Sequence, residues 1–237
     1  MSVILQTSDL RKSFGGAHVI NGIDFEIHEG ECRCVIGPNG AGKSTFFKLL
    51  VGEHRPSRGA VHFLGRPVSH LRPFRRVQMG MSIKFQVPGI FPDLTVRDHL
   101  KLVTHRAPAR PRDAGSVARL MKMFELCEEG DQKAGHLSHG KKQWLEIAMA
   151  VALEPKLLLL DEPVAGLSDE ETVQTGQLIN RLKEQGLTIM VVEHDMTFVR
   201  QVATRVTVLH AGRVFADGPL TDILNRDDVA EIYLGKR

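Results

Sequence analysis

Eight consecutive residues constrain the fold of this 237-residue chain more than any other feature. They match the pattern G-x-x-x-x-G-K-[ST] and lie between an apolar run at 32–36 and a helical pattern at 44–51. Small residues let backbone N–H groups curl around phosphate oxygens, and a following helix directs its unsatisfied N–H groups and its positive dipole end at the same anion. A strand, this loop and a helix therefore predict a phosphate-binding core. The loop residues are Gly37, Pro38, Asn39, Gly40, Ala41, Gly42, Lys43 and Ser44.

The loop predicts a nucleoside triphosphate and Mg²⁺ as ligands. Lys43 supplies a mobile cation for the β- and γ-phosphates, and the Ser44 hydroxyl is a ligand for Mg²⁺. Thr45 comes next, at the start of the helix, and we include it among the nucleotide contacts. A dinucleotide fold is disfavoured because Gly40, Gly42 and Thr45 do not complete the pattern G-x-G-x-x-G. By itself the loop indicates a nucleoside triphosphatase of unspecified kind.

Two acidic residues follow a second buried strand, 157–160. Ligands bind at the carboxyl ends of strands in open α/β sheets. We expect Asp161 to hold Mg²⁺ and Glu162 to orient and deprotonate the attacking water, and the alternative for Asp161 is a helix N-cap. His194 follows a third strand, 187–192, where we expect it to contact the γ-phosphate rather than lie passively on the surface. Together with Lys43, Glu162 and His194 are predicted catalytic residues.

The distribution of apolar residues and helix formers along the chain indicates how the chain is organised. Strands that are apolar throughout and alternate with helices predict a parallel sheet covered on both faces. Residues 87–153 are richer in helix formers and predict a helical lobe inserted between two strands of that sheet. We therefore expect a single domain over 1–237, in which 1–86 and 154–237 form the nucleotide-binding core.

Another helix is predicted from Ser168, where Glu171 completes a capping box, to Gly186. Its expected buried face carries Val173, Leu178, Ile179 and Leu182. We expect Cys32 and Cys34 on one core strand, and Trp144 and Met149 in the lobe, to serve packing only.

Composition excludes several classes of protein. Hydrophobic residues make up 42% and charged residues 25% of the chain, which is typical of globular proteins and not of disordered ones. No apolar run approaches the ~18 residues that cross a bilayer, and residues 1–12 lack the pattern of a secretory signal. The three cysteines indicate a reduced cytoplasmic protein rather than a disulfide scaffold. Net charge is +3, but residues 54–122 carry fourteen Lys or Arg against three acids, which fits a solvated surface, nucleic acid or an anionic membrane.

In sequence order the chain carries the phosphate loop, Gln86, Leu137–Lys141, Leu160–Glu162 and His194. This order resembles the ATP-binding cassette (ABC) family of transport ATPases over essentially the whole chain. The resemblance implies an ATPase of α/β class. Its P-loop NTPase core has a mainly parallel sheet with flanking helices, accompanied by an antiparallel N-terminal β subdomain and the inserted helical lobe. Residues 137–141 correspond to the family's signature motif in that lobe.

The resemblance also implies roles for further residues. Phe14 corresponds to the aromatic residue that stacks on adenine. Gln86 corresponds to the glutamine that senses Mg²⁺ and the attacking water, so we count it both as a metal ligand and as a catalytic residue. Two cassettes of the family pair head to tail, and Ser138 and Gly140 of one would then contact the γ-phosphate of ATP held by the other.

Three positions depart from the family pattern. His139 replaces a glycine and Lys141 replaces the glutamine of the signature. In the D-loop, residues 165–168, Ser168 stands where many members have aspartate. We expect His139 and Lys141 to tune the closed dimer rather than to perform chemistry, because the phosphate contacts fall on Ser138 and Gly140.

Longer stretches are similar to the ATPases of branched-chain amino acid and urea or short-chain amide importers. These stretches are 84–88, 91–96, 137–147, 161–166 and 229–235, and the last three are similar to the urea-type subunit in particular. The similarity implies transmembrane permease subunits, a second and paralogous ATPase subunit and, indirectly, a periplasmic binding protein as partners. It also implies a peripheral location on the cytoplasmic face of the inner membrane, with no nucleic acid as partner.

Three alternatives remain open. One is the ATPase of a lipopolysaccharide-type exporter, and another is a non-transport ABC protein that acts on nucleic acid or ribosomes. The aromatic content of 5% leaves little for base stacking, which disfavours the second. The third, an inactive binding module, is disfavoured because Lys43, Ser44, Asp161, Glu162 and His194 are all present.

Overall fold

Strand β3 (Cys32–Ile36) is buried along its whole length and leads directly into the phosphate loop. In this computed structural model, which describes residues 2–84, 89–105 and 114–234, β3 lies inside a six-stranded sheet of order β10-β9-β3-β8-β7-β6. All neighbours pair in parallel except β9 and β10, which are antiparallel. The mainly parallel sheet is therefore confirmed. Its other strands are β6 (Met81–Lys84), β7 (Leu157–Asp161), β8 (Thr188–Val192), β9 (Arg205–His210) and β10 (Arg213–Pro219).

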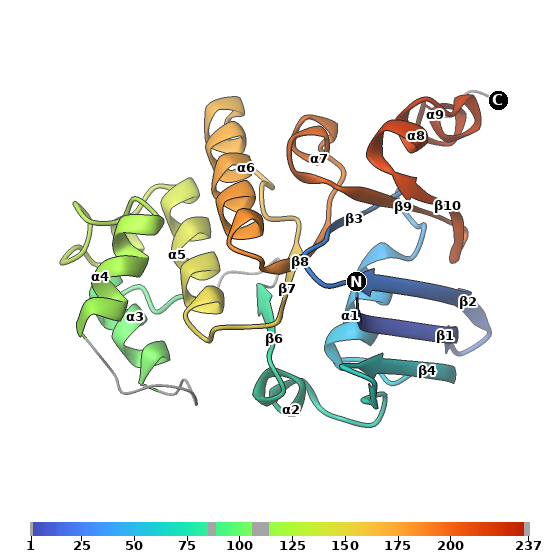
Figure 1. Cartoon of the computed structure of the whole chain (residues 1–237), viewed down its shortest axis with the longest axis horizontal. Coiled ribbons are helices and arrows are strands. Elements are labelled where there is room, and N and C mark those ends of the chain that lie inside the picture. The colour runs from blue at the N-terminus through green and yellow to red at the C-terminus, as the bar shows by residue number, and fades with distance from the viewer. Residues whose placement is uncertain (1, 85–88, 106–113, 235–237) are drawn as a thin grey trace.

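A second sheet is antiparallel and has the order β2-β1-β4-β5. Its hairpin turns at Gly15, which has φ 57°, a conformation that favours glycine. This sheet confirms the antiparallel N-terminal β subdomain. Figure 1 shows it beside the parallel sheet, with α1 against it. Its strands are β1 (Val3–Phe14), β2 (Ala17–His28), β4 (Arg58–Phe63) and β5 (Arg66–Pro67).

Helix α1 (Lys43–Val51) packs between the two sheets, where it contacts β2, β7 and β8. Phe46 and Phe47 on α1 are fully buried in a cluster that also contains residues of both sheets. This packing fixes the helix end that faces the phosphate loop. The remaining helices of the core are α2 (Pro73–Gln78), α6 (Asp169–Glu184), α7 (Met196–Val202), α8 (Leu220–Leu224) and α9 (Asp227–Leu234).

The helices between β6 and β7 form a group of their own at one side of the molecule (Figure 1). Trp144 joins this group to the core, because its Nε1 donates to Thr175 Oγ1 of α6 at 2.9 Å. Trp144 is buried and Met149 packs against the same cluster, as expected of packing residues. The helices of the group are α3 (Val96–Thr104), α4 (Ala114–Met123), the 3-10 turn η1 (Ala134–His136) and α5 (His139–Val151).

Helix α6 confirms its predicted start and, with Leu178, Ile179 and Leu182 buried, its predicted buried face except at Val173. Ser168 and Glu171 form the expected capping box. Val173, however, is 41% exposed, whereas Thr175 and Gly176 are buried. A Cβ at Gly176 would lie 2.1 Å from the Gln201 side chain, so α6 presents small residues to its neighbours. Close helix packing thus overrides the hydrophobic periodicity on which the prediction rested.

Two other expectations concern cysteines and membrane spans. Cys32 and Cys34 are both fully buried in β3, as expected of structural residues. Across the described ranges, no helix combines the length and the apolar character needed to span a bilayer.

Candidate active site

The phosphate loop leaves the carboxyl end of β3, and its backbone explains its glycines. Gly37 has φ 153° and Gly42 has φ 100°, both in the region that disfavours side chains. A Cβ at Gly37 would lie 2.3 Å from the Leu209 carbonyl oxygen, and one at Gly42 would lie 2.8 Å from Ile20 Cδ1. The loop is therefore pressed against the core, and any side chain at these positions would displace it.

Lys43 lies across the mouth of the loop. Its Nζ donates to the carbonyl oxygens of Gly37 at 2.7 Å and Pro38 at 3.1 Å. Burial lowers the pKa of Lys43, and the charges of Glu162 and Asp161 oppose that shift. Ser44 is exposed beside it at the start of α1, where the first backbone N–H groups of a helix lack intrahelical partners. The start of α1 thus offers N–H donors to an anion, and the Ser44 hydroxyl to the cation that accompanies the anion.

Asp161 is the last residue of β7 and Glu162 follows it, so both acids lie at the carboxyl end of the strand, as predicted from the sequence. Asp161 is buried, and burial, assisted by the charge of Glu162, raises its pKa to about 6. Oxygen ligands suit Mg²⁺, and a cation would offset the cost of burying this carboxylate. The next residue, Glu162, has φ 46°, which is unusual for a side-chain-bearing residue and typical of strained functional positions.

His194 lies close to Glu162, as the predicted catalytic set requires. Its Nδ1 is 3.8 Å from Glu162 Oε1 and 3.7 Å from Glu193 Oε2, and its side chain is 61% exposed. The structure therefore brings Lys43, Asp161, Glu162 and His194 to one edge of the parallel sheet, since the strands β3, β7 and β8 all end there.

Glu193 is a residue of this site that the sequence analysis did not single out. It is fully buried, and its carboxylate accepts hydrogen bonds from the backbone N–H groups of Val164, His194 and Asp195. Burial raises its pKa, and the three N–H groups oppose that shift. Glu193 thus joins the turn after Glu162 to the turn that carries His194. An acid at the end of an apolar strand was the available signal.

Phe14 ends β1 and is 44% exposed. Its ring meets His54 edge-on at 5.2 Å, and Lys12 Nζ lies 4.8 Å from the ring centroid. One aromatic face with an adjacent cation suits a purine ring, which is the role expected of Phe14.

The turn formed by residues 138–140 of the signature motif makes contacts of its own at the start of α5. Ser138 caps α5, as its Oγ accepts from Lys141 N at 3.2 Å, and Gly140 is buried. Beyond α5, His139 Nε2 lies 3.1 Å from the carbonyl oxygen of Ala165, and Gly140 lies against the side chain of Glu171. The predicted residues therefore fall into two groups, one around Lys43 and one at the start of α5. Gln86, the remaining predicted residue, lies outside the described residues.

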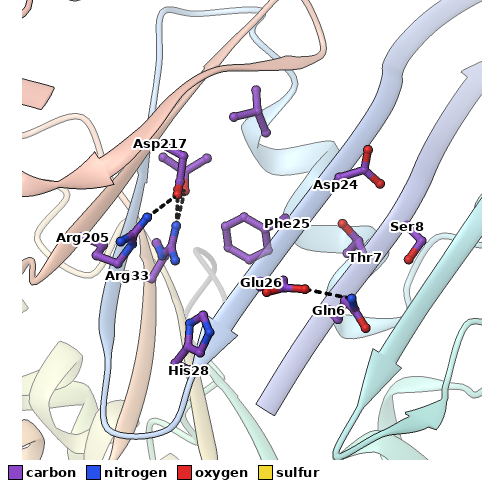
Figure 2. Close-up of a pocket in the computed structure, with 12 residues that line it drawn as sticks. Gln6, Thr7, Ser8, Asp24, Phe25, Glu26, His28, Arg33, Arg205 and Asp217 are labelled. Carbon is purple, nitrogen blue, oxygen red and sulfur yellow. Dashed lines mark hydrogen bonds and ion pairs between the residues drawn. The ribbon is translucent and has the colours of Figure 1, made fainter. Parts of the chain in front are cut away.

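A separate pocket of about 370 Å³ lies at the other end of β3 (Figure 2). Its floor is the buried guanidinium of Arg33, which pairs with Glu31 and Asp217 and donates to Thr207 Oγ1. Figure 2 shows Arg205 and Arg33 both directed at Asp217. These charges satisfy one another, so the pocket is an ionic junction between the two sheets rather than the phosphate site.

Comparison with known proteins agrees with this geometry. Residues 20–165 match the family described as ABC transporter. The chain belongs to the ABC transporter family. This ABC ATPase is 32% identical over 250 residues to the high-affinity branched-chain amino acid transport ATP-binding protein BraF of Pseudomonas aeruginosa, with 98% of each chain covered. It is 31% identical over 236 residues to the lipopolysaccharide export system ATP-binding protein LptB of Acidithiobacillus ferridurans, covering 99% of this chain and 98% of LptB.

Solved structures resemble this ABC ATPase over most or all of its length. The ADP conformation of MJ1267, an ATP-binding cassette of an ABC transporter, superposes with a TM-score of 0.89 at 27% identity and 100% coverage of both chains. A dimeric structure of MJ0796, a bacterial ABC transporter cassette, has a TM-score of 0.81 at 25% identity and covers 92% of this chain and 99% of its own. The predicted family, fold class and ATPase activity are therefore confirmed.

Proposed function

We propose that this ABC ATPase is the subunit that powers an importer of branched-chain amino acids, urea or short-chain amides. The observation that carries the proposal is the similarity to BraF, which extends over 98% of both chains. The solute itself is recognised by other subunits in this scheme, so the ATPase supplies the energy and not the selectivity.

In the proposed reaction, ATP lies with its adenine on Phe14 and its phosphates in the loop 37–45. Lys43 would leave the carbonyl oxygens of Gly37 and Pro38 and turn to the β- and γ-phosphates. Mg²⁺, held by Ser44, Asp161 and Gln86, would neutralise phosphate charge when bound. Two oxygen donors at the start of α1 and the end of β7 fit that ion, and the carboxylate is buried enough to gain from it.

Glu162 is the proposed base for the attacking water. Its carboxylate is partly exposed and lies near His194, so that it can accept a proton while His194 contacts the γ-phosphate. Both residues stand on turns that Glu193 joins, which holds them in fixed relation to each other. Preorganised donors and acceptors of this kind supply most of the stabilisation in phosphoryl transfer.

The second group of residues implies a partner. Ser138 and Gly140 lie at the start of α5, where Ser138 is the N-cap, and a helix N-terminus suits an anion. In the proposed head-to-tail dimer they would meet the γ-phosphate of ATP bound to a second, paralogous cassette. The dimeric structure of the MJ0796 cassette supports pairing. Permease subunits would place this dimer on the cytoplasmic face of the membrane, and a periplasmic binding protein would deliver the solute.

The test is transport in proteoliposomes that contain this chain, its candidate paralogue and the permease subunits encoded beside it. With ATP inside and the binding protein outside, labelled leucine, urea and acetamide are offered separately. Uptake of one of them that is lost in a Glu162→Gln variant supports the proposal. ATP hydrolysis without uptake of any would contradict it.

Export is the second candidate, because LptB is 31% identical over nearly its full length. An exporter ATPase would hydrolyse ATP faster with lipopolysaccharide in the bilayer and would not respond to a periplasmic binding protein. Measuring the ATPase rate with each addition separates the two directions.

A further inference from the structure

His139 makes a defined contact at a signature position where the family usually has glycine. Its Nε2 lies 3.1 Å from the carbonyl oxygen of Ala165. Since a carbonyl oxygen only accepts, Nε2 carries the proton and donates it. The ring also lies against Gly166, where an added Cβ would be 3.3 Å from Nε2. His139 thus ties the start of α5 to the segment that follows Glu162.

The far end of this contact leads to Glu162. The backbone N–H of Ala165 donates to the carbonyl oxygen of Glu162 at 3.3 Å. Glu162 itself has φ 46°, a conformation that persists only where surrounding contacts hold it. Two hydrogen bonds in series therefore connect His139 to the turn that presents the proposed base.

The start of α5 and the segment that follows Glu162 also pack against each other through residues other than His139. A Cβ at Gly140 would lie 2.5 Å from Glu171 Oε1, and Glu171 Oε2 accepts from Ser168 N at 3.1 Å. This packing depends on Gly140, Ser168 and Glu171. Loss of the His139 side chain, which is exposed, therefore removes one directional bond and leaves the packing in place.

We propose that His139 is a positioning residue that couples the two nucleotide sites of the dimer. The inference rests on the head-to-tail pairing proposed above. In that pairing the Ser138–Gly140 turn meets ATP held by the second cassette, whereas Glu162 acts on ATP held by its own chain. His139 joins these two places within one chain, so that closure on one nucleotide sets the turn of the base for the other. A glycine at 139 lacks this link.

The first test needs neither ATP nor a dimer. Backbone amide exchange of residues 162–168 is compared in wild type, His139→Gly, His139→Gln and, as control, His136→Gly, which removes another exposed histidine. We expect exchange about fivefold faster in His139→Gly, because the segment opens more often once the hydrogen bond to the carbonyl oxygen of Ala165 is lost. His139→Gln, whose amide nitrogen reaches as far as Nε2, should match wild type, as should the control. Unchanged exchange in His139→Gly would overturn the proposal.

The second test measures hydrolysis by the dimer. His139→Gly should lower kcat about three- to tenfold, leave KM for ATP within about twofold and move the Hill coefficient toward unity, since ATP contacts remain and coupling is lost. His139→Gln should restore all three values. A rise in KM at constant kcat, or no rescue by glutamine, would overturn the proposal. A wild-type chain that neither hydrolyses ATP nor dimerises in its presence would instead refute the dimer mechanism. The exchange result would then report only a local hydrogen bond within one chain.

Discussion

Lys84 and Glu146 face the same cavity of about 230 Å³ between β6 and α5, and each has one buried polar atom with no hydrogen-bond partner among the described residues. Lys84 is 2% exposed and Glu146 is 8% exposed. Burial lowers the pKa of Lys84 and raises that of Glu146, while their opposite charges resist both shifts. Burial of either charge alone costs free energy, and the attraction between the two charges across the cavity therefore reduces that cost.

This relationship predicts a favourable coupling between the two side chains. In a double-mutant cycle of Lys84→Met and Glu146→Gln, measured by urea unfolding near neutral pH, we expect an interaction energy of about 1 kcal/mol. The coupling should vanish near pH 4, where Glu146 is protonated because its pKa is raised. The cycle of Lys156→Met with Glu146→Gln is the matched control, as Lys156 is exposed. Equal coupling in both cycles would contradict the prediction.

Asp161 predicts a pH-dependent gain from a neutral substitution. Its pKa is 3.8 in the unfolded chain and about 6 in the fold. Since the folded state holds the proton more tightly, stability from this group is full below pH ~4 and is lost as the pH rises to ~6. Asp161→Asn should therefore raise the free energy of unfolding without nucleotide by about 2–3 kcal/mol near neutral pH, and by little near pH 4. Urea unfolding at both pH values checks this, and an equal gain at both would contradict it.

Lys43→Ala should weaken MgATP binding and lower hydrolysis at least about 100-fold. The substitution removes the cation proposed to meet the β- and γ-phosphates, where charge stabilisation carries most of the catalysis. Lys142→Ala, which removes a lysine from α5, is the control for general loss of positive charge. Phosphate release and nucleotide titration are the measurements. Hydrolysis within a few-fold of wild type would show that the loop is not the site.

Glu162→Gln should trap an ATP-bound dimer, either of this chain alone or with a paralogous partner. The glutamine keeps the shape but removes the base, so intact ATP would continue to join Lys43 of one cassette to Ser138 and Gly140 of the other. Without ATP the chain should be mostly monomeric, because facing donor-rich surfaces then lack an anion between them. Light scattering with and without ATP decides this, with Glu170→Gln on the exposed first turn of α6 as control. If ATP changes the molar mass neither for this chain alone nor for this chain with the paralogous partner, the mechanism in which two cassettes share each ATP is refuted.

Phe91→Cys should cross-link to cytoplasmic loops of the permease. The apolar, proline-punctuated stretch 86–95 in the sequence makes this segment our candidate for the main permease contact, and Ile90 and Phe91 are the possible probes. In the structure Phe91 is 55% exposed, whereas Ile90 packs against the core, so Phe91 is the better probe. Leu94, whose backbone N–H donates to the carbonyl oxygen of Phe91, is exposed as well, and neighbouring exposed apolar residues often mark an interface. Val173→Cys, which is exposed on α6, is the control. No cross-link from Phe91 in any nucleotide state would count against this surface.

The core of the site is predictable from the amino-acid sequence, because its residues occupy defined positions next to local secondary structure. The loop at 37–44 must follow a strand and precede a helix. Asp161 and Glu162 come directly after the apolar run 157–160, and His194 comes two residues after the run 187–192. Parallel strands place their carboxyl ends at one sheet edge, so this spacing was enough to bring Lys43 near the two acids. The capping box at Ser168 was equally local and equally readable.

Features that depend on contacts between segments distant in the sequence became visible only in the folded chain. Glu193 became a junction because three N–H groups from two turns converge on its buried carboxylate. Val173 turned outward because α6 presents Thr175 to Trp144 and Gly176 to Gln201, a packing choice that periodicity cannot encode. The bond from His139 to Ala165, 26 residues along the chain, likewise exists because the fold places the start of α5 against the turn after β7. A residue's identity sets the groups it can offer, but burial and partners arise only when the chain is folded.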